Sequence, residues 1–192
     1  MLTADRLKLM EIETERLLLR MFRPDDADVM YERIWTDPAV MRFVQPGGWP
    51  HPREESANFL DRLVTRFRDN GFGQWAVTLK DGGELLGYCG LKTLADTPDI
   101  ELLYGIVEEH WGRGLVTEAA RAALRFGFEE AGLDYIVAIA LPENVASQRV
   151  MEKLGMRREG MARHYNYDVV RYSMRREDFR PDPDAAYVLR RV

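Results

Sequence analysis

Short apolar segments separated by polar turns predict alternating strands and helices along this chain. Seven segments have the apolar content typical of strands: 15–21, 73–79, 85–91, 101–107, 135–140, 163–167 and 169–174. Four segments show helical spacing: 24–36, 54–69, the stretch from just after Gly114 to about Ala131, and 146–154. Lys80-Asp81-Gly82-Gly83 predicts a hairpin turn, a further turn is expected near Asn166, and the proline-rich and glycine-rich residues 46–52 predict a loop.

The order of these elements, β-α-α-β-β-β-α-β-α-β-β, is neither a strict alternation nor a simple meander. It predicts a mixed sheet with helices on both faces, an α+β architecture. Residues 1–192 are expected to form a single domain, because the length suits one core and no linker or repeat interrupts it. Ala57, Leu60, Val64 and Phe67 form the expected apolar face of one helix. Gly127 in mid-helix indicates close packing against a sheet or a ligand.

A glycine-rich turn joins the 101–107 strand to the helix that follows. Gly112 and Gly114 allow a sharp turn and a close approach to a ligand. The helix after them presents unpaired N–H groups and the positive end of its dipole, which suits a diphosphate. The segment lacks the lysine and hydroxyl of a P-loop and the third glycine of a Rossmann fingerprint, so we expect a diphosphate that is held and not cleaved. The alternative is an ordinary loop before a helix.

Two segments together resemble a known family. Trp111-Gly-Arg-Gly114-Leu-Val-Thr-Glu118-Ala resembles the coenzyme A signature of the GNAT acetyltransferases, in its RimJ/RimL-like form. The segment from Asn144 to Gly155 resembles that family's second signature, at the right spacing. The resemblance extends from residues 13–20 to residues 168–173. Two departures are Trp111, where the family often has Gln or Arg, and Val116, where it prefers Ala or Gly.

This resemblance implies a GNAT fold that uses acetyl-CoA and no metal. In that fold the strands at 101–107 and 135–140 splay apart, and the acyl-pantetheine enters the gap between them. The residues that the resemblance assigns to the coenzyme are Gly112, Arg113, Gly114, Leu115, Val116 and Thr117 for the pyrophosphate, with Ile106, Val107 and Asn144 for the pantetheine arm. Lys153 could also meet a coenzyme phosphate, although an ordinary surface lysine explains it as well.

Glu101 is the candidate general base. Its neighbours Ile100, Leu102 and Leu103 are apolar, and such surroundings raise the pKa of a glutamate towards the range useful for taking an amine proton. The alternative is a glutamate on a solvated strand face. The family resemblance supports the first interpretation, because an acid at this place often orders the amine or its water.

Ser147 is the candidate proton donor for the leaving thiolate. Many GNAT members have a tyrosine at the position of Met151, and methionine cannot donate a proton. Ser147 shares one helical face with Val150, Met151 and Leu154, where a hydroxyl needs a partner. The alternative is that Ser147 bonds a helix carbonyl or takes part in capping near Asn144, itself a good N-cap.

The acceptor implied by the family is a primary amine: a protein N-terminus, a lysine, an amino acid, a polyamine or an aminoglycoside. An α-amine is roughly a third neutral at pH 7.5 and a lysine only about 0.1%, which favours an α-amine. Substrate loops are expected at 41–52, with Trp49, and at 163–167. Two other classes remain: a non-catalytic acyl-CoA-binding regulatory module, and a structural protein without a ligand.

Composition narrows the remaining possibilities. The net charge of −5 argues against non-specific nucleic-acid binding. Cys89 lies in an apolar run and is expected to be a buried, inert thiol. His51, His110 and His164 have no metal-ligand spacing. No apolar run reaches the length of a membrane span, and the first ten residues lack a signal-peptide core. We therefore expect a cytoplasmic monomer or homodimer.

Overall fold

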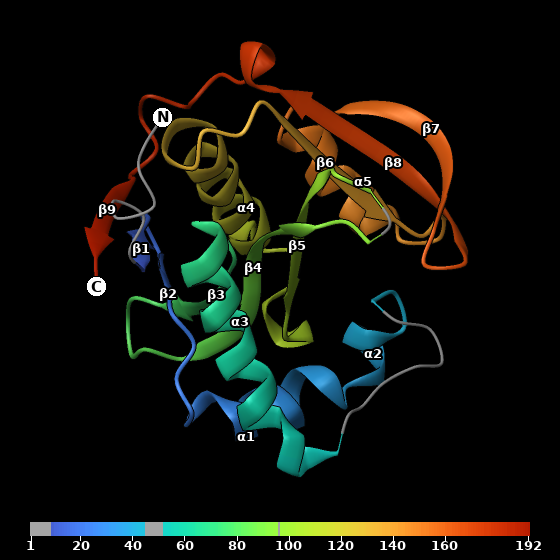
Figure 1. Ribbon diagram of the computed structural model, residues 1–192. Helices are drawn as coiled ribbons and strands as arrows, with labels where there is room; N and C mark the ends of the chain where they lie inside the picture. The colour runs from blue at the N-terminus through green and yellow to red at the C-terminus, as the bar shows by residue number, and fades with distance from the viewer. Residues whose placement is uncertain (1–8, 45–51, 96) are drawn as a thin grey trace.

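One mixed sheet runs through the molecule (Figure 1). The computed structural model describes residues 9–44, 52–95 and 97–192, and within them nine strands form this sheet. The strands are β1 (Met10–Glu13), β2 (Leu17–Arg20), β3 (Gln74–Leu79), β4 (Leu85–Thr93), β5 (Ile100–Ile106), β6 (Tyr135–Ala140), β7 (Arg157–His164), β8 (Tyr167–Arg175) and β9 (Val188–Arg191). They lie in the order β7-β8-β6-β5-β4-β3-β2-β1-β9, and β5 with β6 is the one parallel pair among them.

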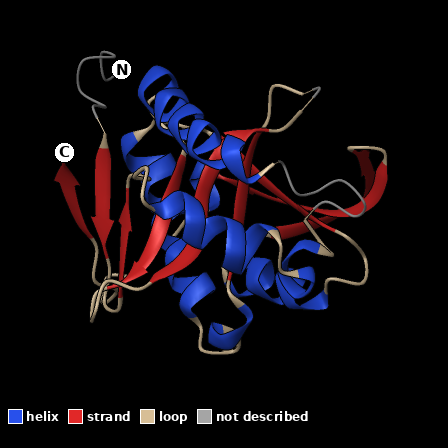
Figure 2. Cartoon of the chain, turned by 90° about the horizontal axis from the view of Figure 1, so that it is seen from below, coloured by secondary structure: helices blue, strands red, loops and turns tan. Residues whose placement is uncertain are grey.

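Helices cover both faces of the sheet, as the order of elements predicts (Figure 2). They are α1 (Asp26–Met30), the π-helical η1 (Tyr31–Trp35), α2 (Pro38–Met41), α3 (Ser56–Asn70), α4 (Leu115–Arg125), the π-helical η4 (Phe126–Glu130) and α5 (Val145–Lys153), with short 3-10 turns η2 (Arg53–Glu55), η3 (Glu108–His110) and η5 (Arg176–Asp178). Helices α1 and α3 pack on each other and contact β4 and β3. Helix α4 packs over β4 and β5, and α5 lies beside α4 and β6.

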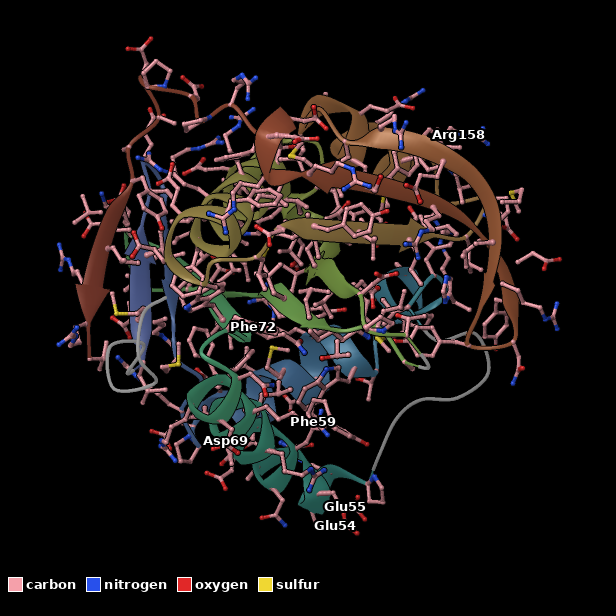
Figure 3. All side chains as sticks on the ribbon, turned by 45° about the horizontal axis from the view of Figure 1, so that its top comes forward. Glu54, Glu55, Phe59, Asp69, Phe72 and Arg158 are labelled. Atoms are coloured by element: carbon pink, nitrogen blue, oxygen red, sulfur yellow. The ribbon has the colours of Figure 1, made fainter. Side chains whose placement is uncertain are left out.

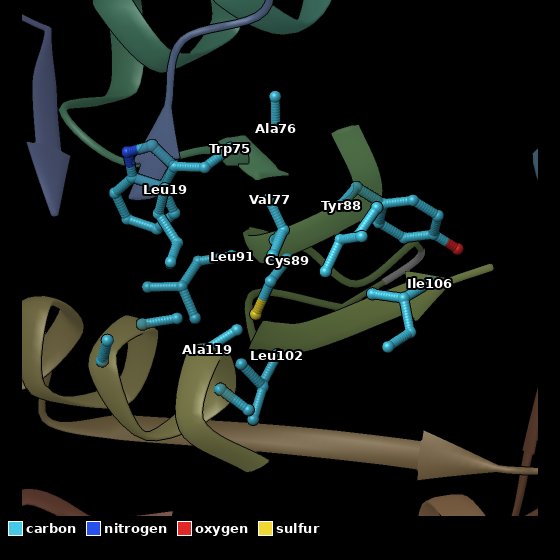
Figure 4. Close-up of a cluster of buried hydrophobic side chains, with 14 of the residues drawn as sticks. Leu19, Trp75, Ala76, Val77, Tyr88, Cys89, Leu91, Leu102, Ile106 and Ala119 are labelled. Atoms are coloured by element: carbon cyan, nitrogen blue, oxygen red, sulfur yellow. The ribbon is translucent and has the colours of Figure 1, made fainter. Parts of the chain in front are cut away.

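The core between α4 and the sheet is close-packed. Figure 4 shows Cys89, Leu91 and Leu102 on the side of the strands that faces Ala119 of α4. Cys89 is fully buried, and burial raises the pKa of its thiol, so it is unreactive as expected. A Cβ at Gly127 would lie 2.7 Å from Cδ1 of Ile136, which confirms the close packing expected at this glycine.

Helix α3 has one buried face and one solvated face. Leu60 and Phe67 are buried as predicted, but Ala57 is exposed and Leu63 is buried in its place. The buried stripe is therefore centred slightly to one side of the predicted one. Figure 3 shows Glu54, Glu55 and Asp69 on the outside of this part of the chain, where the residues are exposed.

Several predicted boundaries were wrong at the edges of the sheet. The sequence pattern did not indicate β1 or β9, which pair with each other at one end of the sheet. It also did not indicate that the 24–36 helix changes to a π-helix at Tyr31. At the other edge, the first of the last two strands is β7 (Arg157–His164), not 163–167, and β8 begins at Tyr167. The turn at Tyr165 and Asn166 is confirmed, and both residues have positive φ angles (51° and 66°). Strands β7 and β9 are the edges of the sheet and bury little, so their sequences carry a weak apolar signal. Strand β1 lies between β2 and β9, and its alternation extends over only four residues, Met10-Glu11-Ile12-Glu13.

A polar cluster anchors the β7–β8 hairpin. Glu159 of β7 accepts hydrogen bonds from Ser173 (2.6 Å), Arg171 (2.8 Å) and Tyr135 (2.9 Å). Partial burial alone would raise the pKa of Glu159, but these hydrogen bonds outweigh it and lower the pKa to about 2. Arg171 also reaches Asp99 at 2.8 Å, which ties the hairpin to the start of β5.

Candidate functional site

Strands β5 and β6 separate soon after they begin. Their parallel pairing is confined to Ile100 with Ile136 and Glu101 with Val137. Beyond that point β5 continues along β4 and β6 continues along β8. The splay predicted for these two strands is thus confirmed, and the divergence opens the middle of the sheet.

A cavity of about 730 Å³ occupies this opening. Its walls come from β4, β5, β6, α5 and the β7–β8 turn, and from the end of the helical segment before residue 45. The lining residues are Phe43, Val44, Tyr88, Lys92, Glu101, Leu102, Leu103, Tyr104, Ile139, Ala140, Leu141, Asn144, Ser147, Met151, His164, Tyr165, Asn166, Tyr167 and Val169. The cavity therefore reaches residues on both faces of β5. Of the expected substrate loops, 163–167 contributes to it, while Trp49 lies outside the described residues.

Glu101 is buried in this cavity. Only 6% of its surface is exposed, so the alternative of a solvated glutamate is excluded. It lies directly opposite Lys92 of β4, and Oε2 is 3.3 Å from the Lys92 Nζ atom. Burial raises the pKa of Glu101, and the positive charge of Lys92 only partly opposes this. The site therefore holds a carboxylate with an unusually high proton affinity.

Ser147 faces the cavity from the first turn of α5. Its N–H donates to Oδ1 of Asn144 at 3.1 Å, so Asn144 is the N-cap of the helix as predicted. Its hydroxyl lies 3.1 Å from the hydroxyl of Tyr104, which also donates to the Ser147 carbonyl oxygen at 3.2 Å. Met151 lies nearby in the same lining. Ser147 does take part in capping, but only through its backbone N–H. Its hydroxyl group is not used by the cap and interacts with Tyr104.

Tyr104 was not foreseen as a site residue. Alternation along β5 puts it on the opposite face from Glu101, and two residues on opposite faces of a strand are normally separated by the sheet. Here the sheet is open, so one cavity reaches both. Burial raises the pKa of Tyr104, and the hydrogen bond with Ser147 opposes this only in part. Tyr104 is therefore a neutral hydroxyl donor at any physiological pH.

The glycine turn is open above both of its glycines. Gly112 and Gly114 have φ angles of 75° and 78°, and Gly114 is the N-cap of α4. A Cβ at Gly112 would meet no atom within 4 Å, and one at Gly114 would meet only Nη2 of Arg16, at 3.6 Å. The Arg16 guanidinium also donates to the carbonyl oxygen of Arg113, which holds the turn in place. The Leu115 side chain is buried, so only its backbone faces this turn.

Two expected coenzyme residues are not brought to the cavity. Ile106 and Val107 are both 2% exposed and lie outside its lining. The Ile106 carbonyl oxygen accepts from Nε1 of Trp111 at 2.8 Å, and the Val107 N–H donates to the Leu86 carbonyl at 2.9 Å. These backbone groups already have partners, and the pantetheine role of both residues stays a prediction.

A second cavity, of about 380 Å³, begins at the glycine turn. It runs along α4 under the segment 179–187, and its lining includes Gly114, Thr117, Arg121 and Lys153. Lys153 thus shares a cavity with part of the turn, and its phosphate role stays a prediction. Within the described residues, no group of three or more His, Cys, Asp or Glu side chains could hold a metal ion, and no helix is long and apolar enough to cross a membrane.

Known proteins share the sequence pattern and the fold of this chain. The family model for the acetyltransferase (GNAT) domain matches residues 16–157, which include the glycine turn, β5, β6 and α5. The chain belongs to the GNAT acetyltransferase family. It is therefore an acetyl-CoA-dependent N-acetyltransferase of the GNAT fold.

Relatives of this GNAT enzyme cover most of its length. The uncharacterized N-acetyltransferase YnaD of Bacillus subtilis (strain 168) is 34% identical over 79% of this chain and 85% of that protein. The crystal structure of a GNAT-family acetyltransferase from Bacillus anthracis is 31% identical, with a TM-score of 0.73 over 87% of this chain and 99% of the other. A ribosomal-protein-S5-alanine acetyltransferase from Vibrio fischeri shares the fold at 22% identity, with a TM-score of 0.70 over 89% of this chain and 99% of that one.

Proposed function

We propose that this GNAT enzyme moves the acetyl group of acetyl-CoA directly to an α-amine, at a protein N-terminus or on a small molecule, as a RimJ/RimL-like member of the family. The observation that supports this most is the single cavity between β5 and β6. It brings together a buried carboxylate, Glu101, and a pair of hydroxyl groups, Tyr104 and Ser147. A reaction that takes a proton from an amine and gives one to a sulfur atom needs both kinds of group.

The described residues fit the coenzyme. The turn from Gly112 to Thr117 is open above its two glycines and ends in the free N–H groups of α4, which suits a pyrophosphate. Arg121 and Lys153 line the adjoining cavity and would face its remaining phosphate. The capping side chain of Asn144 lines the main cavity and would face the pantetheine arm. When bound, acetyl-CoA supplies an acetyl group activated as a thioester.

Glu101 would accept the amine proton, directly or through a water molecule. Burial raises its pKa, so the proton affinity of the carboxylate is closer to that of an α-amine than an exposed glutamate's would be. An α-amine also needs less help than a lysine, because more of it is neutral at physiological pH. The larger neutral fraction favours an α-amine acceptor.

Ser147 would give up the proton of its hydroxyl group towards the leaving sulfur. Tyr104 lies 3.1 Å away and can donate a hydrogen bond to the Ser147 oxygen as that proton leaves. Burial raises the pKa of Tyr104, so its hydroxyl group keeps its own proton, and solvent returns a proton to Ser147 after the products leave. The two hydroxyl groups therefore form a hydrogen-bonded pair on the α5 side of the cavity, in which Ser147 is the proton donor and Tyr104 supports it.

The test is a comparison of acceptors that differ only in which amine is free. Thiol release from acetyl-CoA is measured with a peptide whose lysine is blocked, with the same peptide whose N-terminus is blocked, with a free amino acid and with a polyamine. We expect the fastest release with an acceptor that has a free α-amine. Equal rates with and without every acceptor would contradict the proposal.

A further inference from the structure

Lys92 of β4 faces Glu101 across the pair of strands. The two residues are direct cross-strand neighbours, with the Nζ atom 3.3 Å from Oε2. The Glu101 side chain is 8% exposed, and Lys92 is 36% exposed and reaches it from the rim of the cavity. Among the described residues that line this cavity, Lys92 is the only lysine or arginine.

Tyr165 holds the ammonium group from the other side of the opening. Its hydroxyl accepts hydrogen bonds from Lys92 Nζ at 3.1 Å and from the backbone N–H of Ala95 at 3.3 Å. Its ring centre lies 5.1 Å from the same Nζ atom, within the range of a cation–π contact. Tyr165 is at the tip of the β7–β8 hairpin and has a φ of 51°, unusual for a residue with a side chain. The hairpin thus reaches back across the cavity to β4.

We propose that Lys92 is a positioning residue for Glu101: its ammonium group keeps the carboxylate ionised and in place at the acceptor side of the cavity, and Tyr165 fixes the ammonium group there. The inference rests on the proposed function of Glu101 as the base. Lys92 itself needs no contact with either substrate.

The physical reason is that a buried carboxylate is a base only while it is ionised. Burial favours the protonated form of Glu101, and Lys92 supplies the nearest compensating charge. The other titratable groups do not replace it: Tyr88 on β4 is buried and neutral, and Val137 is the facing residue on β6. Near the start of β5, Asp99 is already paired with Arg171.

On the hairpin side, His164, Tyr165 and Tyr167 also line the cavity. A hydrogen bond with Tyr165 also opposes the rise in the pKa of Glu101. None of the three is a permanent cation, however, so removal of Lys92 leaves Glu101 without a fixed positive partner on any of these elements. An opposite charge at this distance lowers the pKa of a carboxyl group by about one to three pH units. Because Lys92 is partly exposed, we expect a value near the lower end of this range.

The chain offers a matched control in Lys80. It is 37% exposed and pairs with a different glutamate, Glu13, at 2.7 Å. Both residues of that pair lie outside the lining of the main cavity. Lys80→Met therefore removes a comparable ion pair without touching Glu101.

The decisive experiment titrates the carboxyl group of Glu101 by NMR on isotope-labelled protein, with the resonance assigned from Glu101→Gln. In Lys92→Met we expect the titration midpoint to rise by about one pH unit. Lys92→Arg and Lys80→Met should leave it near the wild-type value, and Tyr165→Phe should raise it by less. A midpoint in a folded Lys92→Met protein equal to that of the wild type would overturn the proposal. If Lys92→Met does not fold, Lys92→Gln replaces it, and an unchanged midpoint in that variant would overturn the proposal.

The pH profile of kcat/KM on the best acceptor then tests the link to catalysis. Its acidic limb should move with the carboxyl midpoint in Lys92→Met and stay in place in Lys80→Met. A carboxyl midpoint that moves without the rate profile would overturn the positioning role. A wild-type protein that acetylates no acceptor would instead contradict the proposed function, and the NMR comparison would still decide whether Lys92 keeps Glu101 ionised.

Discussion

Removal of the Ser147 hydroxyl group separates its proposed chemical role from its structural one. The helix cap uses the backbone N–H of Ser147, which keeps its bond to Asn144 in Ser147→Ala. The Tyr104 hydroxyl also keeps an acceptor, because the Ser147 carbonyl oxygen lies 3.2 Å away. No buried donor is left without a partner, so the free energy of unfolding should fall by only about 1 kcal/mol.

The rate should fall far more than the stability. If the hydroxyl group supplies the proton to the leaving sulfur, its loss should lower kcat by up to about a hundredfold. That deficit should shrink above about pH 8.5, a typical thiol pKa, because the thiolate can then leave without a proton. Tyr104→Phe should show a smaller deficit with the same pH dependence, since Ser147 keeps its own hydroxyl group but loses the hydrogen bond that supports it as its proton leaves.

The assay follows thiol release at saturating acetyl-CoA from pH 6 to pH 9.5, with thermal unfolding measured alongside. Ser173→Ala is the matched control. Ser173 is also buried and its hydroxyl donates to Glu159 at 2.6 Å, but it does not line the cavity. It should lower the melting temperature and leave kcat unchanged. Wild-type rates in both Ser147→Ala and Tyr104→Phe across this range would refute the role of this hydroxyl pair.

Three further predictions follow from the turn, the base and the hairpin. Acetyl-CoA at about 100 times its dissociation constant should stabilise the protein by about 2.7 kcal/mol in thermal unfolding, far more than ATP with Mg²⁺ does. Gly114→Val should abolish this stabilisation by acetyl-CoA. Gly82→Val should preserve it, because Gly82 is another glycine with a positive φ (81°) in open space. Glu101→Gln should reduce kcat/KM most at pH values above the Glu101 midpoint where neutral amine is still scarce, and it should remove the acidic limb that Glu101 sets. A uniform reduction at every pH would argue against a base. Glu159 has a folded-state pKa lowered from 4.5 to about 2, so its contribution to stability is complete above about pH 4.5 and is lost as the pH falls towards 2. Because a quarter of this side chain is exposed, the free energy of unfolding should fall by about 1–2 kcal/mol over this range. Acid unfolding is measured for the wild type and for Glu159→Gln, and the same pH dependence in both would contradict this prediction.

Much of the local structure is determined by the sequence alone. The apolar spacing of α3 and α4, the Asn144 cap and the turn around Gly112 and Gly114 depend on residues within a few positions of one another, and all four are present in the structure. Strands β1, β7 and β9 are exceptions. The edge strands β7 and β9 form because a partner strand is available, and they bury too little for their own sequences to show it. Strand β1 alternates over only four residues, and its place between β2 and β9 is decided by the fold.

The candidate site depends on tertiary structure. Its two key contacts join residues far apart in the chain: Tyr104 with Ser147, 43 positions away, and Lys92 with Tyr165, 73 positions away. No periodicity links such positions, and the pKa of Glu101 follows from how deeply the folded chain buries it. The sequence by itself determined which residue types were available and which family they belong to. Only the opening between β5 and β6 decided that a carboxylate on one face of a strand and a hydroxyl pair on the other meet in one cavity, because desolvation and pairing are properties of the packed chain.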